Sequence, residues 1–92
     1  MKVRYTPRAA KDLERLTEFL RTRSPQVAMS IARAIRSTAV SLADQPLSGI
    51  STEDPAVRMR LVKKYRYKIF YTVSDQIQIL HIRHPSRGPD WK

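Results

Sequence analysis

The chain has 92 residues, enough for one modest hydrophobic core, so we expect a single domain over residues 1–92. It contains no cysteine, which excludes disulfide bonds and thiolate metal sites, and it has no apolar run long enough to cross a membrane. Eighteen basic residues against eight acidic ones give a formal net charge of +10, which predicts an acidic partner: nucleic acid, an anionic membrane surface or an acidic protein.

The first half of the chain predicts a short strand followed by two helices. Residues 1–5 alternate apolar and basic side chains and lack the apolar stretch of a secretory signal, so we expect an edge strand and a cytoplasmic protein. Thr6-Pro7 and Ser24-Pro25 each predict a helix start, because Thr and Ser cap helices and Pro suits the first helical position. Apolar residues then recur at helical spacing until Pro46 ends the second helix. The link is short, so the two helices should form an antiparallel hairpin.

Three further strands are predicted after the helices. Residues 57–62 alternate apolar and basic side chains, and residues 66–73 and 77–84 are rich in β-branched and aromatic residues. The last two are close enough to form a hairpin in which Val73 pairs with Ile77. The order β-α-α-β-β-β predicts an α+β fold, an antiparallel sheet with a helical hairpin packed on one face.

Alternation within the final hairpin predicts two different faces of the sheet. The core face would carry Tyr67, Ile69, Tyr71, Val73, Ile77 and Ile79. The opposite face would carry an apolar strip with a basic edge, formed by Lys68, Phe70, Leu80, Ile82 and His84. That strip is either buried under the C-terminal tail or a docking platform for an amphipathic peptide, and both interpretations stay open.

Arg58 and Arg60 alternate with apolar residues, a pattern typical of the solvated face of a half-buried strand. A functional interpretation is also available. Lys68, His84 and Arg87 would fall on the same face, away from the helices, and would make that surface strongly positive.

No cofactor or metal site is predicted. His81 and His84 are too few for a metal site, and their spacing along a strand would place them on opposite faces. The chain also shows neither the Ser/His/Asp order of a hydrolase nor a glycine-rich phosphate loop.

Several short segments stand in an order that is shared with a known family. They are Tyr5-Thr6-Pro7-Arg8-Ala9 with Asp12-Leu13-Glu14, Leu42-Ala43-Asp44-Gln45-Pro46 with Gly49, Arg60-Leu61-Val62, Tyr67-Lys68-Ile69-Phe70-Tyr71, and Ile82-Arg83-His84 with Arg87. Together these resemble the ParE toxins of the RelE/ParE toxin–antitoxin superfamily, which are also known as plasmid stabilisation proteins. The resemblance covers nearly the whole chain and depends on the order and spacing of its pieces.

The resemblance implies the toxin of a type II toxin–antitoxin system, a non-enzymatic inhibitor of DNA gyrase that a ParD-like antitoxin neutralises. The acidic C-terminal segment of such an antitoxin covers the toxin in a hetero-oligomer. The antitoxin also supplies the DNA binding, so neither sequence-specific DNA binding nor membrane contact is expected of this chain. The expected antitoxin contacts are Arg58, Arg60, Lys68, Phe70, Leu80 and Ile82. The expected gyrase contacts are Arg58, Arg60, Arg83 and Arg87.

The alternative is a RelE-like ribosome-dependent mRNA interferase on the same fold. Such an enzyme uses basic residues to activate the ribose 2′-OH, stabilise the developing charge and assist the leaving group. The residues that would do so here are Arg58, Arg60, Lys68, His84 and Arg87. The tail lacks the tyrosine that RelE relatives often place there. A third possibility is a non-toxic family member that only binds its antitoxin.

Overall fold

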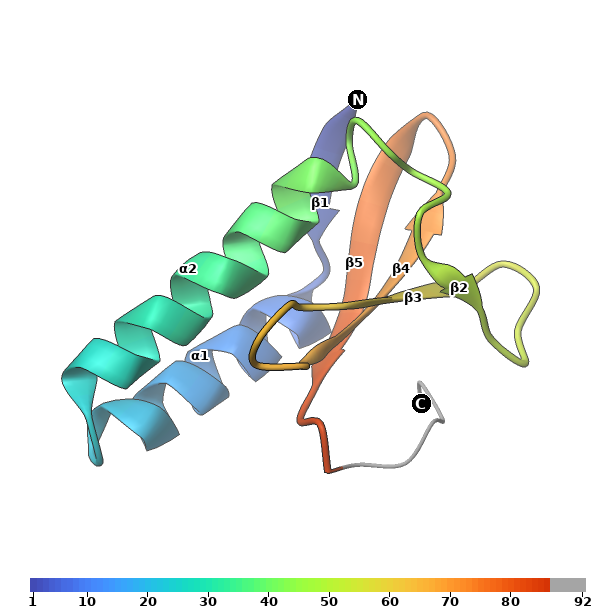
Figure 1. Ribbon diagram of the computed structural model, residues 1–92. Coiled ribbons are helices and arrows are strands. Elements are labelled where there is room, and N and C mark those ends of the chain that lie inside the picture. The colour runs from blue at the N-terminus through green and yellow to red at the C-terminus, as the bar shows by residue number, and fades with distance from the viewer. Residues whose placement is uncertain (87–92) are drawn as a thin grey trace.

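In the computed structural model, described here for residues 1–86, two helices pack on one face of a five-stranded sheet (Figure 1). The elements in chain order are β1 (Lys2–Tyr5), α1 (Pro7–Arg21), α2 (Pro25–Ser41), β2 (Ile50–Ser51), β3 (Arg58–Leu61), β4 (Lys68–Val73) and β5 (Gln76–Arg83). The α+β class and the helical hairpin are therefore confirmed.

Both helices begin where the Thr-Pro and Ser-Pro pairs predict. The Thr6 side chain accepts a hydrogen bond from the Ala9 amide at 3.2 Å, and the Ser24 side chain accepts one from the Val27 amide at 3.3 Å. Each cap satisfies a backbone N–H that has no partner within the first helical turn.

The sheet has the strand order β1-β5-β4-β3-β2 and is mixed rather than wholly antiparallel. β1 runs parallel to β5, with Val3 opposite Ile77, whereas the other neighbouring strands are antiparallel. The antiparallel prediction is thus wrong for β1, whose partner lies more than seventy residues away in sequence. The short edge strand β2 was not predicted either. Its two residues pair with Met59 and Arg58 of β3.

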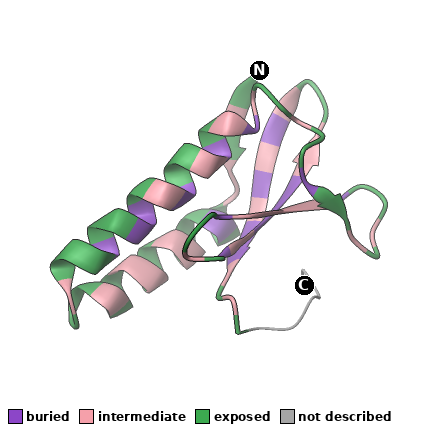
Figure 2. Ribbon diagram, in the orientation of Figure 1, coloured by how far each residue is buried: buried purple, intermediate pink, exposed green. Residues whose placement is uncertain are grey.

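The core lies between the sheet and the helical hairpin, and it appears as the buried bands along β4, β5 and α2 in Figure 2. From the strands and the β3–β4 connection it contains Tyr67, Ile69, Tyr71, Ile77 and Ile79, as predicted, and also Val62 and Ile82. From the helical hairpin and the segment after it come Ala9, Ile31, Ile35, Ala39 and Leu42. Small side chains such as Ala9 and Ala39 let the helices lie close to the sheet.

A β-bulge in β5 changes which side chains share a face. Val73 pairs with Ile77 and Tyr71 with Ile79, as predicted, but the register then shifts and Phe70 pairs with His81. Leu80 and His81 therefore both stand opposite Phe70, and the alternation of the following residues is inverted.

The inversion corrects two predicted positions. Ile82 pairs with Ile69 and is 4% exposed in the core, so the prediction that it belongs to the face away from the helices is wrong. His84 likewise lies against Tyr67, a core-face residue, with 5.5 Å between ring centroids in an edge-on contact. Arg83 pairs with Lys68 and therefore lies on the face away from the helices, where regular alternation would have placed Ile82 and His84.

Beyond the bulge, α1 takes the place of β1 beside β5. β1 ends at Tyr5 opposite Ile79, and Thr6 then donates its backbone N–H to the Ile79 carbonyl at 3.0 Å. The Thr6 hydroxyl donates to the Leu80 carbonyl at 3.2 Å, and the Asp12 carboxylate accepts the Ile82 N–H at 3.0 Å. The helix thus satisfies backbone groups that an edge strand would leave open.

Candidate functional site

Arg58 and Arg60 lie on the same side of the sheet as the helices, not on the opposite one. Their cross-strand partners are Tyr71 and Ile69, which are both core residues. Arg58 Nη1 donates to the Gly49 carbonyl at 2.8 Å, and Arg60 Nη1 donates to the Ser48 hydroxyl at 2.6 Å. The prediction of one positive face containing both arginines and Lys68 is therefore wrong. The two arginines instead hold the loop that follows α2.

The same loop is also held by the hydroxyl of the buried Tyr71 side chain on β4. It donates to the Pro46 carbonyl at 2.8 Å and accepts the Gly49 N–H at 2.9 Å. A Cβ on Gly49 would stand 2.6 Å from this hydroxyl oxygen, so the close approach of backbone and ring requires glycine. Hydrogen bonds from β3 and β4 therefore join this loop to the sheet.

A shallow groove of about 260 Å³ lies on the face away from the helices. Met59, Lys68 and Phe70 line it from β3 and β4, and Ile50 to Glu53 line it from the sheet edge. Phe70 is only 1% exposed, so it forms the floor of the groove rather than a protruding contact, whereas Ile50 is 63% exposed. Lys68 and Leu80 are partly exposed. Of the predicted antitoxin contacts, this face therefore keeps Lys68, Phe70 and Leu80.

The basic residues considered for RNA cleavage do not converge. Arg58 and Arg60 face the loop on the helical side of the sheet, and Lys68 lies on the other side. His84 is exposed, packs against Tyr67 and accepts the Ser86 N–H at 3.1 Å. Arg87 lies outside the described residues.

Arg83, a predicted gyrase contact, stands opposite Lys68 on the far face. Its Nη1 atom is buried and finds no hydrogen-bond partner among residues 1–86. Over residues 1–86, no three His, Cys, Asp or Glu side chains come together as a metal site would require. Neither helix in this part of the chain is long and apolar enough to span a membrane.

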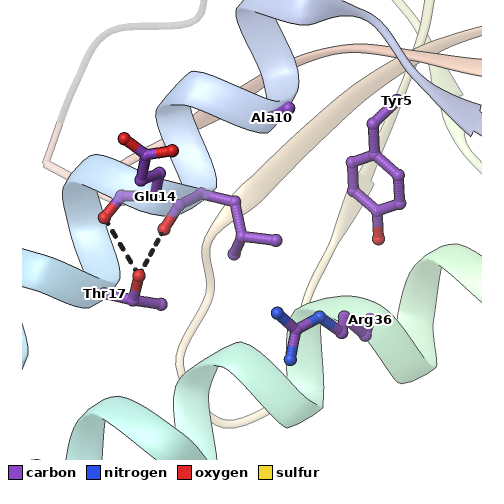
Figure 3. A pocket seen from close by; sticks show the side chains of 6 residues that line it. Tyr5, Ala10, Glu14, Thr17 and Arg36 are labelled. Atoms are coloured by element: carbon purple, nitrogen blue, oxygen red, sulfur yellow. Dashed lines mark hydrogen bonds between the residues drawn. The ribbon is translucent and has the colours of Figure 1, made fainter.

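A pocket of about 420 Å³ opens between α1, α2 and β1 (Figure 3). Tyr5 lines it from β1, Arg36 lines it from α2, and Leu13, Glu14 and Thr17 line it from α1. Burial raises the pKa of the Tyr5 hydroxyl above its ordinary value of 10.0, and the positive charge of Arg36 partly offsets this effect. The Thr17 hydroxyl is occupied by the Leu13 carbonyl at 2.9 Å and the Glu14 carbonyl at 3.0 Å.

A larger cleft, of about 680 Å³, separates the first half of α2 from the turn between β3 and β4. We call it the α2–turn cleft, and its lining residues are Pro25, Gln26, Val27, Met29, Ser30, Arg33, Lys64 and Tyr65. None of these residues was predicted from the sequence to have a functional role. The available signal was the distribution of charge, because residues 19–43 and 55–74 contain no acidic residue.

Comparison with known proteins gives two positive results and one negative. Residues 3–89 match the family model described as "ParE toxin of type II toxin-antitoxin system, parDE". A solved structure titled "Chromosomal ParDE TA system from P. aeruginosa" superposes with a TM-score of 0.80 at 24% sequence identity, covering 91% of this chain and 95% of that chain. At this identity the likeness supports the fold. Among curated proteins, none matches this chain.

Proposed function

Because the chain belongs to the ParE toxin family of type II toxin–antitoxin systems, we propose that it is a toxin that inhibits DNA gyrase. The match of residues 3–89 to the family model carries this proposal. A ParD-like antitoxin neutralises the toxin by covering it with an acidic segment, and both act in the cytoplasm, where gyrase works.

The placement of the basic residues supports inhibition by binding rather than by catalysis. Cleavage of an RNA phosphodiester needs a base, an acid and a charge-stabilising group around one phosphate. Arg58 and Arg60 are committed to loop carbonyl and hydroxyl oxygens, and Lys68 lies on the opposite side of the sheet. These separated positions favour a toxin that occupies a surface of its target.

The charge of the chain supports the acidic antitoxin. A net charge of +10 on 92 residues attracts an acidic segment over long range, and a disordered segment can wrap a large surface as it folds. Part of the folding cost of that segment would be offset by apolar contacts with the exposed Met29 and Ile50 side chains.

The test is a supercoiling assay with purified gyrase, relaxed plasmid and ATP. We expect the full chain to abolish supercoiling in proportion to its concentration, and its ParD-type antitoxin, added beforehand, to restore it. A parallel translation extract containing a reporter mRNA serves as the control. Unchanged supercoiling together with cleavage of the reporter mRNA would refute the proposal and support the mRNA interferase.

A further inference from the structure

Two basic residues in the turn between β3 and β4 adopt an unfavourable backbone conformation. Lys64 has φ 74° and Arg66 has φ 61°, and both values fall in the left-handed region that favours glycine. The turn is closed by hydrogen bonds from the Arg66 amide to the Val62 carbonyl at 2.7 Å and from the Val62 amide to the Tyr67 carbonyl at 2.8 Å. Glycine would adopt this turn at a lower cost, so the side chains at these positions call for another explanation.

The conformation directs Lys64 toward the α2–turn cleft. Lys64 and Tyr65 form one wall, with the Lys64 Nζ atom 5.3 Å from the centre of the Tyr65 ring. The opposite wall is α2, from which Met29 is 60% exposed and Val27 is 44% exposed. Arg33, on the same helix, is exposed and lies 3.5 Å from Met29 through its Nη2 and Sδ atoms. The cleft thus combines apolar side chains on its α2 wall with two cations.

The two segments that build the cleft carry charge of a single sign. The two segments that build it, residues 19–43 and 55–74, hold ten of the eighteen basic residues and no acidic residue. All acidic side chains lie outside these segments. Such segregation produces a positive potential that favours a partner of opposite charge.

We propose that the α2–turn cleft is the docking site for an acidic segment of the antitoxin, a proposal that rests on the proposed function above. An apolar side chain of the segment packs on Val27 and Met29, and carboxylates on either side of it pair with Arg33 and Lys64. The apolar side chains of Val27 and Met29 distinguish this site from a phosphate-binding groove, because a nucleic-acid backbone has no aliphatic side chain that could pack on them.

The backbone of the turn supplies a sharp test, because two glycine substitutions there relieve the same backbone strain but only one of them changes the lining of the cleft. Lys64→Gly and Arg66→Gly each relieve a left-handed residue and each remove one positive charge. Only Lys64 lines the cleft. We expect both variants to unfold within a few degrees of the wild-type melting temperature, since the relieved strain offsets the added freedom of the unfolded chain.

Binding of the full chain to its purified ParD-type antitoxin is then measured by biolayer interferometry. Lys64→Gly should weaken binding roughly tenfold, the effect typical of a contacting interface residue, while Arg66→Gly stays within about twofold of wild type. Met29→Ala should weaken binding similarly. Its matched control is Val40→Ala on the same helix, where the side chain is 64% exposed and outside the cleft.

Equal affinities for Lys64→Gly and Arg66→Gly would overturn the docking site while leaving the toxin assignment intact. A wild-type chain that does not bind the antitoxin at all would overturn the proposed function as well. A labelled DNA duplex is the second probe. If Lys64→Gly weakens duplex binding and leaves antitoxin binding unchanged, the cleft is a nucleic-acid site and the proposal is wrong.

Discussion

The Oδ2 atom of Asp12 on α1 lies 2.5 Å from the Nδ1 atom of His81 on β5 and also accepts the Ile82 N–H at 3.0 Å. Asp12 is separated in sequence from His81 by 69 positions and from Ile82 by 70. The His81 ring in turn stacks on Phe70, with 6.0 Å between ring centroids. One carboxylate therefore joins the first helix to the bulged part of the sheet, where no strand continues β1.

Replacing Asp12 should destabilise the whole domain. Asp12→Ala leaves the Ile82 amide and a His81 ring nitrogen without their acceptor in a largely buried setting, at an expected cost of about 2–3 kcal/mol. Urea unfolding measures this loss. Glu14→Ala, two residues further along α1 and exposed, is the control and should change stability by less than about 0.5 kcal/mol. Similar midpoints for the two variants would contradict the structural role of Asp12.

Phe70 should matter for folding rather than for direct contact with a partner. It is 1% exposed, so Phe70→Ala should lower the free energy of unfolding by about 3–5 kcal/mol. Phe19→Ala is the matched control: this ring is 57% exposed and contacts the Arg23 guanidinium, so its loss should cost less than about 1 kcal/mol. A Phe70 variant as stable as the Phe19 variant would show that this face is open in solution.

Tyr71→Phe should loosen the 46–49 loop without disturbing the core. The change removes the hydroxyl that joins the Pro46 carbonyl and the Gly49 amide, at an expected cost of about 1–2 kcal/mol. Hydrogen exchange at Gly49 should accelerate more than exchange at Ile79, which remains paired within the sheet. Unchanged exchange at Gly49 would mean that Arg58 and Arg60 are sufficient to hold the loop.

Stability should fall in alkaline solution because Tyr67 is buried and Tyr5 is partly buried. Burial raises the pKa of both Tyr5 and Tyr67 above 10.0, so the folded chain holds these protons more tightly than the unfolded chain does. Their contribution is complete below about pH 10 and is lost as the pH rises through the raised values. The double variant Tyr5→Phe/Tyr67→Phe should show a flatter decline of the urea midpoint between about pH 9 and about pH 11. If the urea midpoints of the wild type and the double variant fall equally with pH, the two tyrosines do not cause the loss of stability.

Local signals in the sequence were sufficient to predict most of the elements. The Thr6-Pro7 and Ser24-Pro25 pairs act within one helical turn, and the Val73–Ile77 pairing follows from a short connection. β1 could not be placed in the same way, because its parallel partner β5 is distant in sequence and either sheet edge would accept a short strand.

The two faces of the sheet were predicted less well, because one extra residue in β5 shifts the register between β4 and β5. Apolar residues at Ile77 and Ile79 are followed by Leu80 and Ile82, and this change of parity is the sign of a bulge. A regular strand had assigned Ile82 to the wrong face. Arg58 and Arg60 were misplaced because their face is set by the pairing of β3 with β4, which puts them opposite Tyr71 and Ile69. Alternation within β3 alone does not reveal that pairing.

The proposed gyrase target is tested most directly by pulse-labelling cells after the chain is induced without its antitoxin. Synthesis of DNA, RNA and protein is followed in parallel over the first minutes. We predict that DNA synthesis fails first and that chromosome breaks accumulate, because a blocked gyrase stops replication. If protein synthesis stops first and transcripts are cut within codons, the chain is an RNA-cleaving toxin and the gyrase proposal is wrong.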